Sequence, residues 1–349
     1  MLRRSFLTAV AFLLALAAPG LSQTRPSQTR PFTDAAGRTV EVPAAPQRVL
    51  AAGPPASVLL YALAPEKMVG WVREPSAVEK EYLAAPYRDL PTYGRLTGRG
   101  NTANIEMVLG MQPDLILDVG SVDETYASLA DRVQAQTGIP YVLVDGSFAR
   151  TPETLREVGA LLGVPDAAEA LAAFAEAAIA RLEARVAAIP LDQRPRVYYG
   201  RGPDGLETGL AGSINMEVLD AVGATNVAAA AGWGGLANVS VEQVLAWDPD
   251  VILTQNPDFH AGIAGAPVWG DVAAVREGRV YRVPALPFGW FDTPPGINRI
   301  IGVDWLANVL YPEASDDDLR ERTRAFYQLF YHVELTDAQL DTLLADAAP

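Results

Sequence analysis

Apolar and polar residues alternate along this chain in blocks that are typical of a protein mixing strands and helices. Short apolar runs of strand type are followed by segments in which apolar residues recur every three or four positions, the spacing of a helix. The expected strands are 48–52, 67–72, 141–145, 196–199 and 279–283, and the expected helices are 56–63, 124–137, 214–222, 296–310, 319–330 and 337–345. Because strands alternate with helices, we expect mostly parallel sheets covered by helices on both faces.

One helix–strand pattern occurs twice. Residues 104–120 and 240–256 align at an offset of 136 and agree at Glu106/Glu242, Val108/Val244, Leu109/Leu245, Pro113/Pro249, Asp114/Asp250, Ile116/Ile252 and Leu117/Leu253. Each copy contains a short helix, a Pro-Asp turn and an apolar strand. One αβ unit is therefore used once in each half of the chain, which predicts two similar lobes with a cleft between them.

The longest expected helix covers residues 166–189. It is rich in alanine, Asp166 is placed to cap its start, and Pro190 is placed to end it. A helix of this length would be about 36 Å long, enough to join two lobes; a surface helix on one lobe is the alternative. The predicted fold is two Rossmann-like α/β lobes, residues 32–165 and 190–349, joined by this helix.

The N-terminal residues have the pattern of an export signal. Arg3 and Arg4 precede the apolar run 6–18, and small residues follow, so residues 1–22 are predicted to be a cleaved signal peptide and residues 23–31 a flexible leader. The paired arginines fit both the general and the twin-arginine export routes. The chain has no cysteine, so we expect a periplasmic protein without disulfides or a cysteine-linked lipid anchor.

Charge and residue types exclude several functions. The net charge of −15 gives a surface that repels nucleic acid and anionic lipid. The sequence contains no G-x-S-x-G nucleophile elbow and no zinc-protease motif, so we predict no catalytic residues. His260 and His332 are the two histidines, whereas direct capture of a free transition metal normally uses several imidazoles with carboxylates. We therefore expect no metal bound directly by the protein and no cofactor.

Candidate cargo-binding residues lie in loops that follow the expected strands, where open α/β sheets bind ligands. They are mainly aromatic residues and arginines, which together suit a bulky anionic chelate. The candidates are Pro54, Trp71, Arg73, Tyr93, Arg95, Arg99, Ser121, Tyr199, Arg201, Trp233, Asn256, His260, Trp290 and Phe291. For each aromatic residue the alternative is a place in the core, for each arginine an ion pair, and for His260 a solvated loop.

The two repeats, the expected joining helix and the segments 37–53 and 286–312 resemble the periplasmic binding proteins of ABC importers for ferric siderophores, haem or cobalamin. The resemblance covers nearly the whole chain after the signal peptide. It implies a cargo site between the lobes, small hinge motion, and one glutamate on each lobe that docks onto arginines of the membrane permease. The matching positions here are Glu106 and Glu242. Stabilisation of an acid by the helix dipole in the first turn is a simpler role for both.

We therefore expect an exported, monomeric solute-binding protein that captures a metal chelate and delivers it to an ABC permease dimer with its ATPase. A ferric siderophore or related iron complex is the leading cargo. The alternatives within this class are a small oxoanion such as molybdate, haem or cobalamin. A periplasmic hydrolase and a ligand-reporting partner of a membrane sensor are alternatives of other classes.

Overall fold

The computed structural model describes residues 28–98, 100, 102–314 and 318–345. The predicted signal peptide lies outside the described residues, as does most of the predicted leader. The leader's last residues are part of β1 (Thr29–Thr33), which pairs with β2 (Thr39–Pro43) in an antiparallel hairpin. The Arg30 guanidinium donates to the Ala160 carbonyl at 3.1 Å, so this hairpin is tied to the lobe that follows it.

The N-terminal lobe contains a three-stranded parallel sheet in the order β3–β4–β5. Its strands are β3 (Val49–Ala51), β4 (Leu115–Gly120) and β5 (Tyr141–Asp145), and its helices are α1 (Pro54–Leu63), α2 (Ala77–Lys80), α3 (Ile105–Gly110), α4 (Glu124–Thr137) and α5 (Thr151–Leu162). Almost every residue of these strands is buried, as expected for a parallel sheet covered on both faces.

The prediction of a strand at residues 67–72 is wrong. This segment begins with the last residue of the 3-10 helix η1 (Pro65–Lys67) and then makes two isolated bridges, Met68 to Val49 and Trp71 to Thr92. Because its two partners belong to different segments, the chain crosses from one to the other and cannot build a continuous ladder.

The C-terminal lobe contains a four-stranded parallel sheet in the order β11–β10–β6–β8. Its strands are β6 (Arg196–Tyr199), β8 (Thr225–Asn226), β10 (Val251–Thr254) and β11 (Val280–Arg282), and its helices are α7 (Glu217–Ala221), α8 (Val241–Trp247), α9 (Pro257–Gly262) and α10 (Ala273–Arg276). A separate antiparallel pair, β7 (Glu207–Gly209) and β9 (Leu236–Asn238), lies beside this sheet. The two lobes thus have separate sheets.

The repeated sequence gives the same local structure in each lobe, α3–β4 in one and α8–β10 in the other. The aspartate of each repeat has the same structural role. Asp114 accepts a hydrogen bond from the Arg48 backbone N–H just before β3, and Asp250 accepts one from the Arg196 N–H at the start of β6. Each aspartate therefore fixes the start of the neighbouring strand and sets the register of its sheet.

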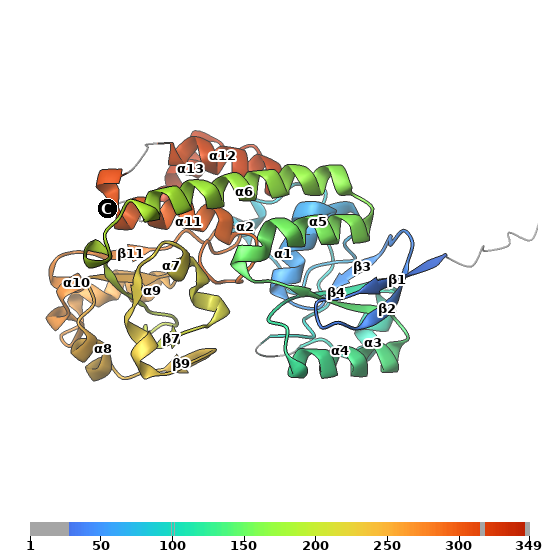
Figure 1. Cartoon of the computed structure of the whole chain (residues 1–349), viewed down its shortest axis with the longest axis horizontal. Coiled ribbons are helices and arrows are strands. Elements are labelled where there is room, and N and C mark those ends of the chain that lie inside the picture. The colour runs from blue at the N-terminus through green and yellow to red at the C-terminus, as the bar shows by residue number, and fades with distance from the viewer. Residues whose placement is uncertain (1–27, 99, 101, 315–317, 346–349) are drawn as a thin grey trace, which may run out of the picture.

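The helix α6 (Pro165–Ala187) joins the lobes and runs along one side of the molecule (Figure 1). It begins one residue earlier than predicted, with Val164 at the N-cap, so Asp166 lies in the first turn and does not cap the helix. The helix packs closely on α5, where a Cβ added to Gly159 would lie 2.1 Å from the Ala168 Cβ. Small residues at this contact allow the two backbones to approach.

The last helices connect both lobes. They are α11 (Arg299–Leu310), α12 (Leu319–Phe330) and α13 (Asp337–Leu344). Although the sequence groups them with the C-terminal lobe, residues after α11 contact the N-terminal lobe: the Tyr61 hydroxyl donates to the Tyr331 carbonyl at 2.6 Å, and the Gln339 amide to the Glu81 carbonyl at 3.0 Å. The chain therefore crosses between the lobes again after α6.

Each helix in the described part of the chain is too short or too polar to cross a bilayer.

Candidate functional site

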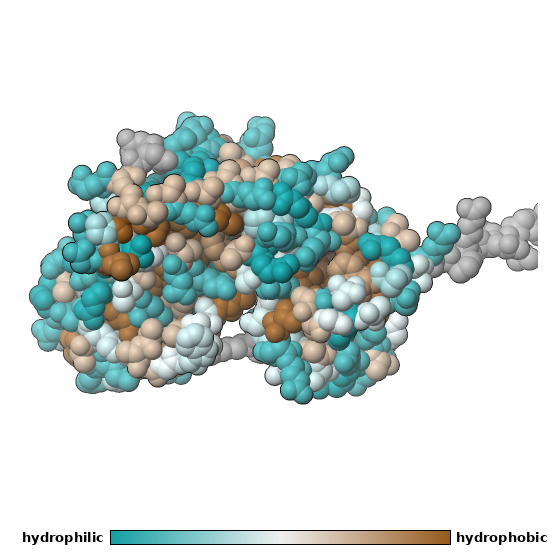
Figure 2. Space-filling view, viewed as in Figure 1, coloured by the Kyte–Doolittle hydropathy of each residue, from teal (hydrophilic) through white to brown (hydrophobic). Residues whose placement is uncertain are grey.

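A cavity of about 900 Å³ lies between the two lobes. In the space-filling view the molecule is hollowed there, on the side facing away from α6 (Figure 2). The N-terminal lobe contributes the start of α1, the loops near residues 71–75 and 95–98, the end of β4 and one side of α4. The C-terminal lobe contributes Arg201, Asn215, Gln255 and the loop 285–295. The walls thus follow the carboxyl ends of strands, where open α/β sheets place their ligand sites.

Two arginines of the N-terminal lobe face this cleft without a carboxylate partner. Arg95 donates from Nε to the Gly100 carbonyl at 3.2 Å and forms no ion pair with any described residue. Arg132, exposed on α4, forms neither an ion pair nor a side-chain hydrogen bond within the described chain. Arg73 differs because Glu79 holds its guanidinium through two hydrogen bonds, at 2.5 and 2.8 Å. Arg95 and Arg132 are therefore available to an anionic ligand.

The floor of the N-terminal side contains a buried carboxyl group. Asp118, at the end of β4, accepts hydrogen bonds from the Thr97 hydroxyl at 3.1 Å and the Tyr141 hydroxyl at 2.9 Å. Burial raises the pKa of Asp118 to about 6, and these hydrogen bonds oppose the rise. This group can change its charge within the ordinary range of extracellular pH.

The C-terminal side contains a buried polar cluster around Asp292. Its carboxyl oxygens accept hydrogen bonds from the Tyr199 hydroxyl at 2.6 Å and the Asn215 amide at 3.1 Å, and Arg201 Nε forms an ion pair with Asp292 at 2.8 Å. Arg201 also pairs with Glu207 through Nη1. Burial raises the pKa of Asp292, whereas the Arg201 charge and the Tyr199 and Asn215 donors oppose that rise. Arg201 is thus already paired with two carboxylates.

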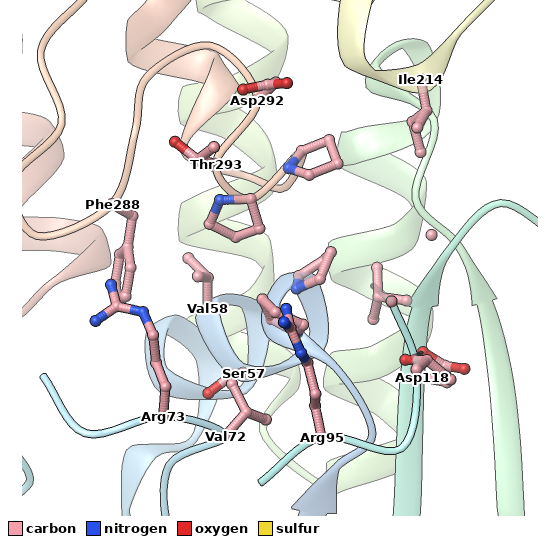
Figure 3. Close-up of a pocket in the computed structure, with 18 of the residues that line it drawn as sticks. Ser57, Val58, Val72, Arg73, Arg95, Asp118, Ile214, Phe288, Asp292 and Thr293 are labelled. Atoms are coloured by element: carbon pink, nitrogen blue, oxygen red, sulfur yellow. Dashed lines mark hydrogen bonds between the residues drawn. The ribbon is translucent and has the colours of Figure 1, made fainter. Parts of the chain in front are cut away.

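Six of the predicted cargo-binding residues line the cleft. They are Pro54, Trp71, Arg73, Arg95, Ser121 and Arg201. Figure 3 shows Arg73 and Arg95 extending into the cavity from the N-terminal lobe, with Asp292 and Thr293 on the opposite side. Trp71 contributes little surface because it is only 2% exposed and its indole N–H donates to the Tyr87 carbonyl.

Four predicted aromatic residues lie in the core and not on the cleft wall. Tyr93 is buried, with its hydroxyl hydrogen-bonded to the Ala51 backbone. Tyr199 and Phe291 are fully buried against each other, with ring centroids 4.2 Å apart, and Trp290 packs near Tyr327. The alternative stated for aromatic residues, a place in the core, is what the structure shows for these four.

Three further candidates lie away from the cleft wall. Trp233 is 82% exposed and packs over Gly212, where an added Cβ would lie 2.6 Å from the indole ring. Asn256 caps α9, accepting the Phe259 N–H at 2.9 Å. His260 Nε2 lies 3.3 Å from the Val280 carbonyl. Arg99 lies outside the described residues.

Several residues on the cleft wall are absent from the candidates drawn from the sequence. They are mostly polar, and include Ser57, Asp118, Arg132, Asn215, Gln255 and Thr293. Asp118 carried a usable signal, because it is an ionisable residue at the end of an apolar strand, in the place that Thr254 has in the second repeat. Arg132 carried none, because it is one charged residue among several on a surface helix.

The described residues contain no cluster of three or more histidine, cysteine, aspartate or glutamate side chains placed to hold a metal ion. The cleft offers arginines, amides and hydroxyl groups. Such groups bind an anion or a complete metal complex by hydrogen bonds, and do not bind a bare cation.

The predicted docking glutamates are exposed and lie on corresponding helices. Glu106 is in the first turn of α3 and Glu242 in the first turn of α8. Figure 1 shows α3 and α8 at the end of the molecule opposite α6, one on each lobe. A hydrogen bond from its own backbone N–H and one from Ser240 lower the pKa of Glu242, so this group is ionised at neutral pH.

Together, the twin lobes, the joining helix and the cleft define a two-lobed α/β binding protein. The model of the periplasmic binding protein family matches residues 59–286, well over half of the chain, and the chain belongs to that family. The resemblance inferred from the sequence is thereby confirmed. Proteins of this family carry a transported ligand and no cofactor.

Individual relatives differ in what their names say they bind. The chain is 29% identical to the molybdate-binding protein MolA of Haemophilus influenzae over 264 residues, which cover 68% of this chain and 72% of MolA. The structure of MolA with bound molybdate superposes with a TM-score of 0.72, at 25% identity, covering 88% of this chain and 99% of MolA. A cobalamin-binding protein of Halobacterium salinarum is 28% identical, covering 63% of this chain and 57% of that protein.

A solved structure with similar overall architecture has no ligand in its name. An ABC transporter solute-binding protein from Sulfurospirillum deleyianum superposes with a TM-score of 0.79 at 30% identity, covering 90% of this chain and 99% of that one. The family and these neighbours are transport binding proteins, and the predicted two-lobed α/β fold is confirmed.

Proposed function

We propose that this protein captures an anionic metal chelate, such as a ferric siderophore, in the cleft and delivers it to an ABC permease driven by its ATPase. Export to the periplasm, through residues 1–22, is part of the same proposal, and the protein acts as a monomer without catalysing a reaction. The observation that carries the proposal is a pair of arginines, Arg95 and Arg132, on the wall of a large cleft between the lobes; neither has a carboxylate partner among the described residues. Guanidinium groups match the carboxylate and catecholate oxygens of such chelates.

The size of the cleft supports a bulky ligand. Ligand sites for molecules of drug size have volumes of about 300–1,000 Å³, and the cleft here, at about 900 Å³, is near the upper end of that range. A single tetrahedral oxoanion would fill only a small part of it. The joining helix α6 also restricts how far the lobes can close around a small ion.

The apolar surface of the cleft wall comes from residues other than those predicted. Four aromatic residues expected on the wall, Tyr93, Tyr199, Trp290 and Phe291, are in the core. The accessible wall instead combines arginines and polar groups with prolines at positions 54, 55, 75, 287, 294 and 295. Proline rings offer rigid apolar surface, so the wall still presents apolar contact beside cationic groups.

Molybdate is the second candidate, because MolA is both a sequence relative and a structural neighbour. A tetrahedral dianion would also be attracted by Arg95 and Arg132. To bind such a small dianion, several hydrogen-bond donors must converge on one point. The lobes would have to close to bring enough donors together.

Isothermal titration calorimetry separates these candidates. The purified protein is titrated with ferric citrate, a ferric catecholate and a ferric hydroxamate siderophore, haemin, cyanocobalamin and sodium molybdate, with each metal-free chelator as the matched control. We expect saturable binding of a ferric chelate with a Kd of about 1 μM or tighter, and much weaker binding of its metal-free form. Binding of molybdate alone would select the second candidate, and binding of none of these compounds would refute both.

A further inference from the structure

The arginines on the two walls of the cleft differ in whether a described carboxylate is paired with them. On the N-terminal wall, Arg95 and Arg132 have no carboxylate partner among the described residues, and Arg73 is balanced by Glu79. Asp118 supplies one negative charge to this wall, and its two oxygens already accept hydrogen bonds from hydroxyl groups. A surplus of positive charge remains on this side.

On the C-terminal wall the arginine is already paired. Arg201 has two carboxylate partners, Asp292 and Glu207, and its side chain is only 17% exposed. Asp292 is fixed from the other side by Tyr199 and Asn215. Arg201 is held by both carboxylates, so it does not attract an additional anion as a free arginine would.

The C-terminal wall also has an uncharged donor. The Gln255 Nε2 atom is buried and has no hydrogen-bond partner among the described residues, although its side-chain oxygen accepts from the Thr293 hydroxyl. A buried donor without a partner costs free energy that a ligand oxygen can recover. Gln255 therefore suits a neutral oxygen of the ligand.

We propose that the cargo presents its negative charge to the N-terminal wall only, held by Arg95 and Arg132, and turns an uncharged, hydrogen-bonding side toward Gln255 and the C-terminal wall. This inference rests on the proposed function and narrows it to chelates whose anionic groups lie on one side. Arg201, which was predicted to bind cargo, becomes a positioning residue that orders Asp292. A symmetric dianion gripped equally by both lobes does not fit this arrangement.

The test compares variants of the two walls by calorimetry, with ferric citrate or whichever ferric chelate binds the wild type. Arg95→Gln and Arg132→Gln remove the free guanidinium groups, and we expect each to weaken binding about tenfold or more. The loss should be smaller in 0.5 M NaCl, because salt screens exposed charges. Arg156→Gln, which removes a surface arginine paired with Glu169 and Glu176, is the matched control for lost charge.

The C-terminal wall is tested with Glu207→Gln, which keeps the Arg201–Asp292 pair and so avoids leaving a buried carboxylate alone. If Arg201 held the cargo's charge, releasing it from Glu207 would strengthen binding about tenfold or more; we expect a change of less than about threefold. Strengthening by Glu207→Gln, or unchanged binding in Arg95→Gln and Arg132→Gln, overturns the inference while leaving the proposed function intact. A wild type that binds no ferric chelate overturns the proposed function itself.

Discussion

Asp118 is an ionisable side chain of the cleft whose charge depends on ordinary changes of pH. Its pKa of about 6 results from burial at the end of β4, and the Thr97 and Tyr141 hydroxyls limit the rise. Tyr126 of α4, whose own pKa is raised by burial and by the Asp118 charge, also lines this wall. The two histidines, His260 and His332, do not line the cleft.

We predict that the affinity for an anionic chelate rises about five- to tenfold when the pH falls from 7.5 to 5, because protonation of Asp118 removes a negative charge from the wall. The measurement is calorimetric Kd against pH, with a ferric chelate that is stable over this range. Asp118→Asn, which is uncharged at every pH, should bind the chelate throughout with the affinity that the wild type has at pH 5. A wild-type profile that matches that of Asp118→Asn would contradict the prediction.

The same group affects stability with a defined sign. The folded-state pKa of Asp118 lies above its ordinary value of 3.8, so folding binds the proton more tightly. Its contribution to stability is present below about pH 4 and is lost as the pH rises through about 6. Burial of this carboxylate is therefore a cost at neutral pH, as is common for groups that serve a binding site.

At the residue scale, the predicted arginines that the structure describes line the cleft, whereas four of the predicted aromatic residues lie in the core. Arg73, Arg95 and Arg201 line the cleft, because a charged group in a loop after a strand remains at the surface. Tyr199, the last residue of β6, and Trp290, in the loop after β11, lie in the core, because a large ring can turn inward when its polar atom finds a partner there. Sequence alone contains nothing that distinguishes the two directions.

The helices α3 and α8 are the elements through which we propose that the protein contacts its permease. Each begins with a capping side chain: Asn104 accepts from the Met107 N–H at 2.7 Å, and Ser240 accepts from the Gln243 N–H at 3.3 Å. Glu106 and Glu242 therefore occupy the same position in equivalent, well-defined turns. A pair of similar basic pockets on a two-fold symmetric permease could accept both.

We predict that the double variant Glu106→Ala, Glu242→Ala keeps the wild-type Kd for the chelate and loses uptake. Both side chains are exposed and far from the cleft wall, so neither cargo binding nor folding depends on them. Calorimetry and uptake of radioactive iron by cells carrying the transporter give the two measurements. Glu153→Ala, an exposed glutamate in the first turn of α5, is the control and should transport normally. Loss of cargo affinity in the double variant would refute the docking role.

At the scale of elements, the sequence predicted best where periodicity and end signals agree. The helices 124–137 and 319–330 and the strands 141–145 and 196–199 have the predicted bounds. The pair β7–β9 and the helix α5 were not predicted. The strands of that pair have only three residues each, too few to establish a period of two, so their pairing depends on tertiary contacts.

At the scale of the whole molecule, the lobes are connected by more than the joining helix. Glu217 of α7 accepts hydrogen bonds from the Phe148 backbone N–H of the N-terminal lobe at 2.7 Å and from Arg299 at 2.6 Å. Arg299, which is 1% exposed, also donates to the Gly146 carbonyl of the N-terminal lobe at 2.5 Å. This set of residues forms a latch behind the cleft, and the contacts of Tyr61 with Tyr331 form a second tie.

A sequence cannot reveal such a latch, because Phe148, Glu217 and Arg299 are far apart along the chain and carry no common motif. These contacts stabilise the structure because the Arg299 guanidinium is buried. Burial lowers the pKa of Arg299, whereas the Glu217 carboxylate raises it and keeps the guanidinium charged. With α6, the latch and the C-terminal helices all crossing between the lobes, we expect the lobes to move little relative to each other and to unfold together.

We predict that Glu217→Ala lowers the free energy of unfolding by about 3 kcal/mol, because it leaves the buried Arg299 charge and the Phe148 N–H without their partner. Urea unfolding, followed by tryptophan fluorescence and by far-ultraviolet circular dichroism, gives this value. Glu169→Ala, which breaks an exposed pair with Arg156, is the control and should cost less than about 1 kcal/mol. Both probes should show one coincident transition in the wild type. Two separate transitions there, or an effect of Glu217→Ala no larger than that of the control, would show that the latch does not hold the lobes together.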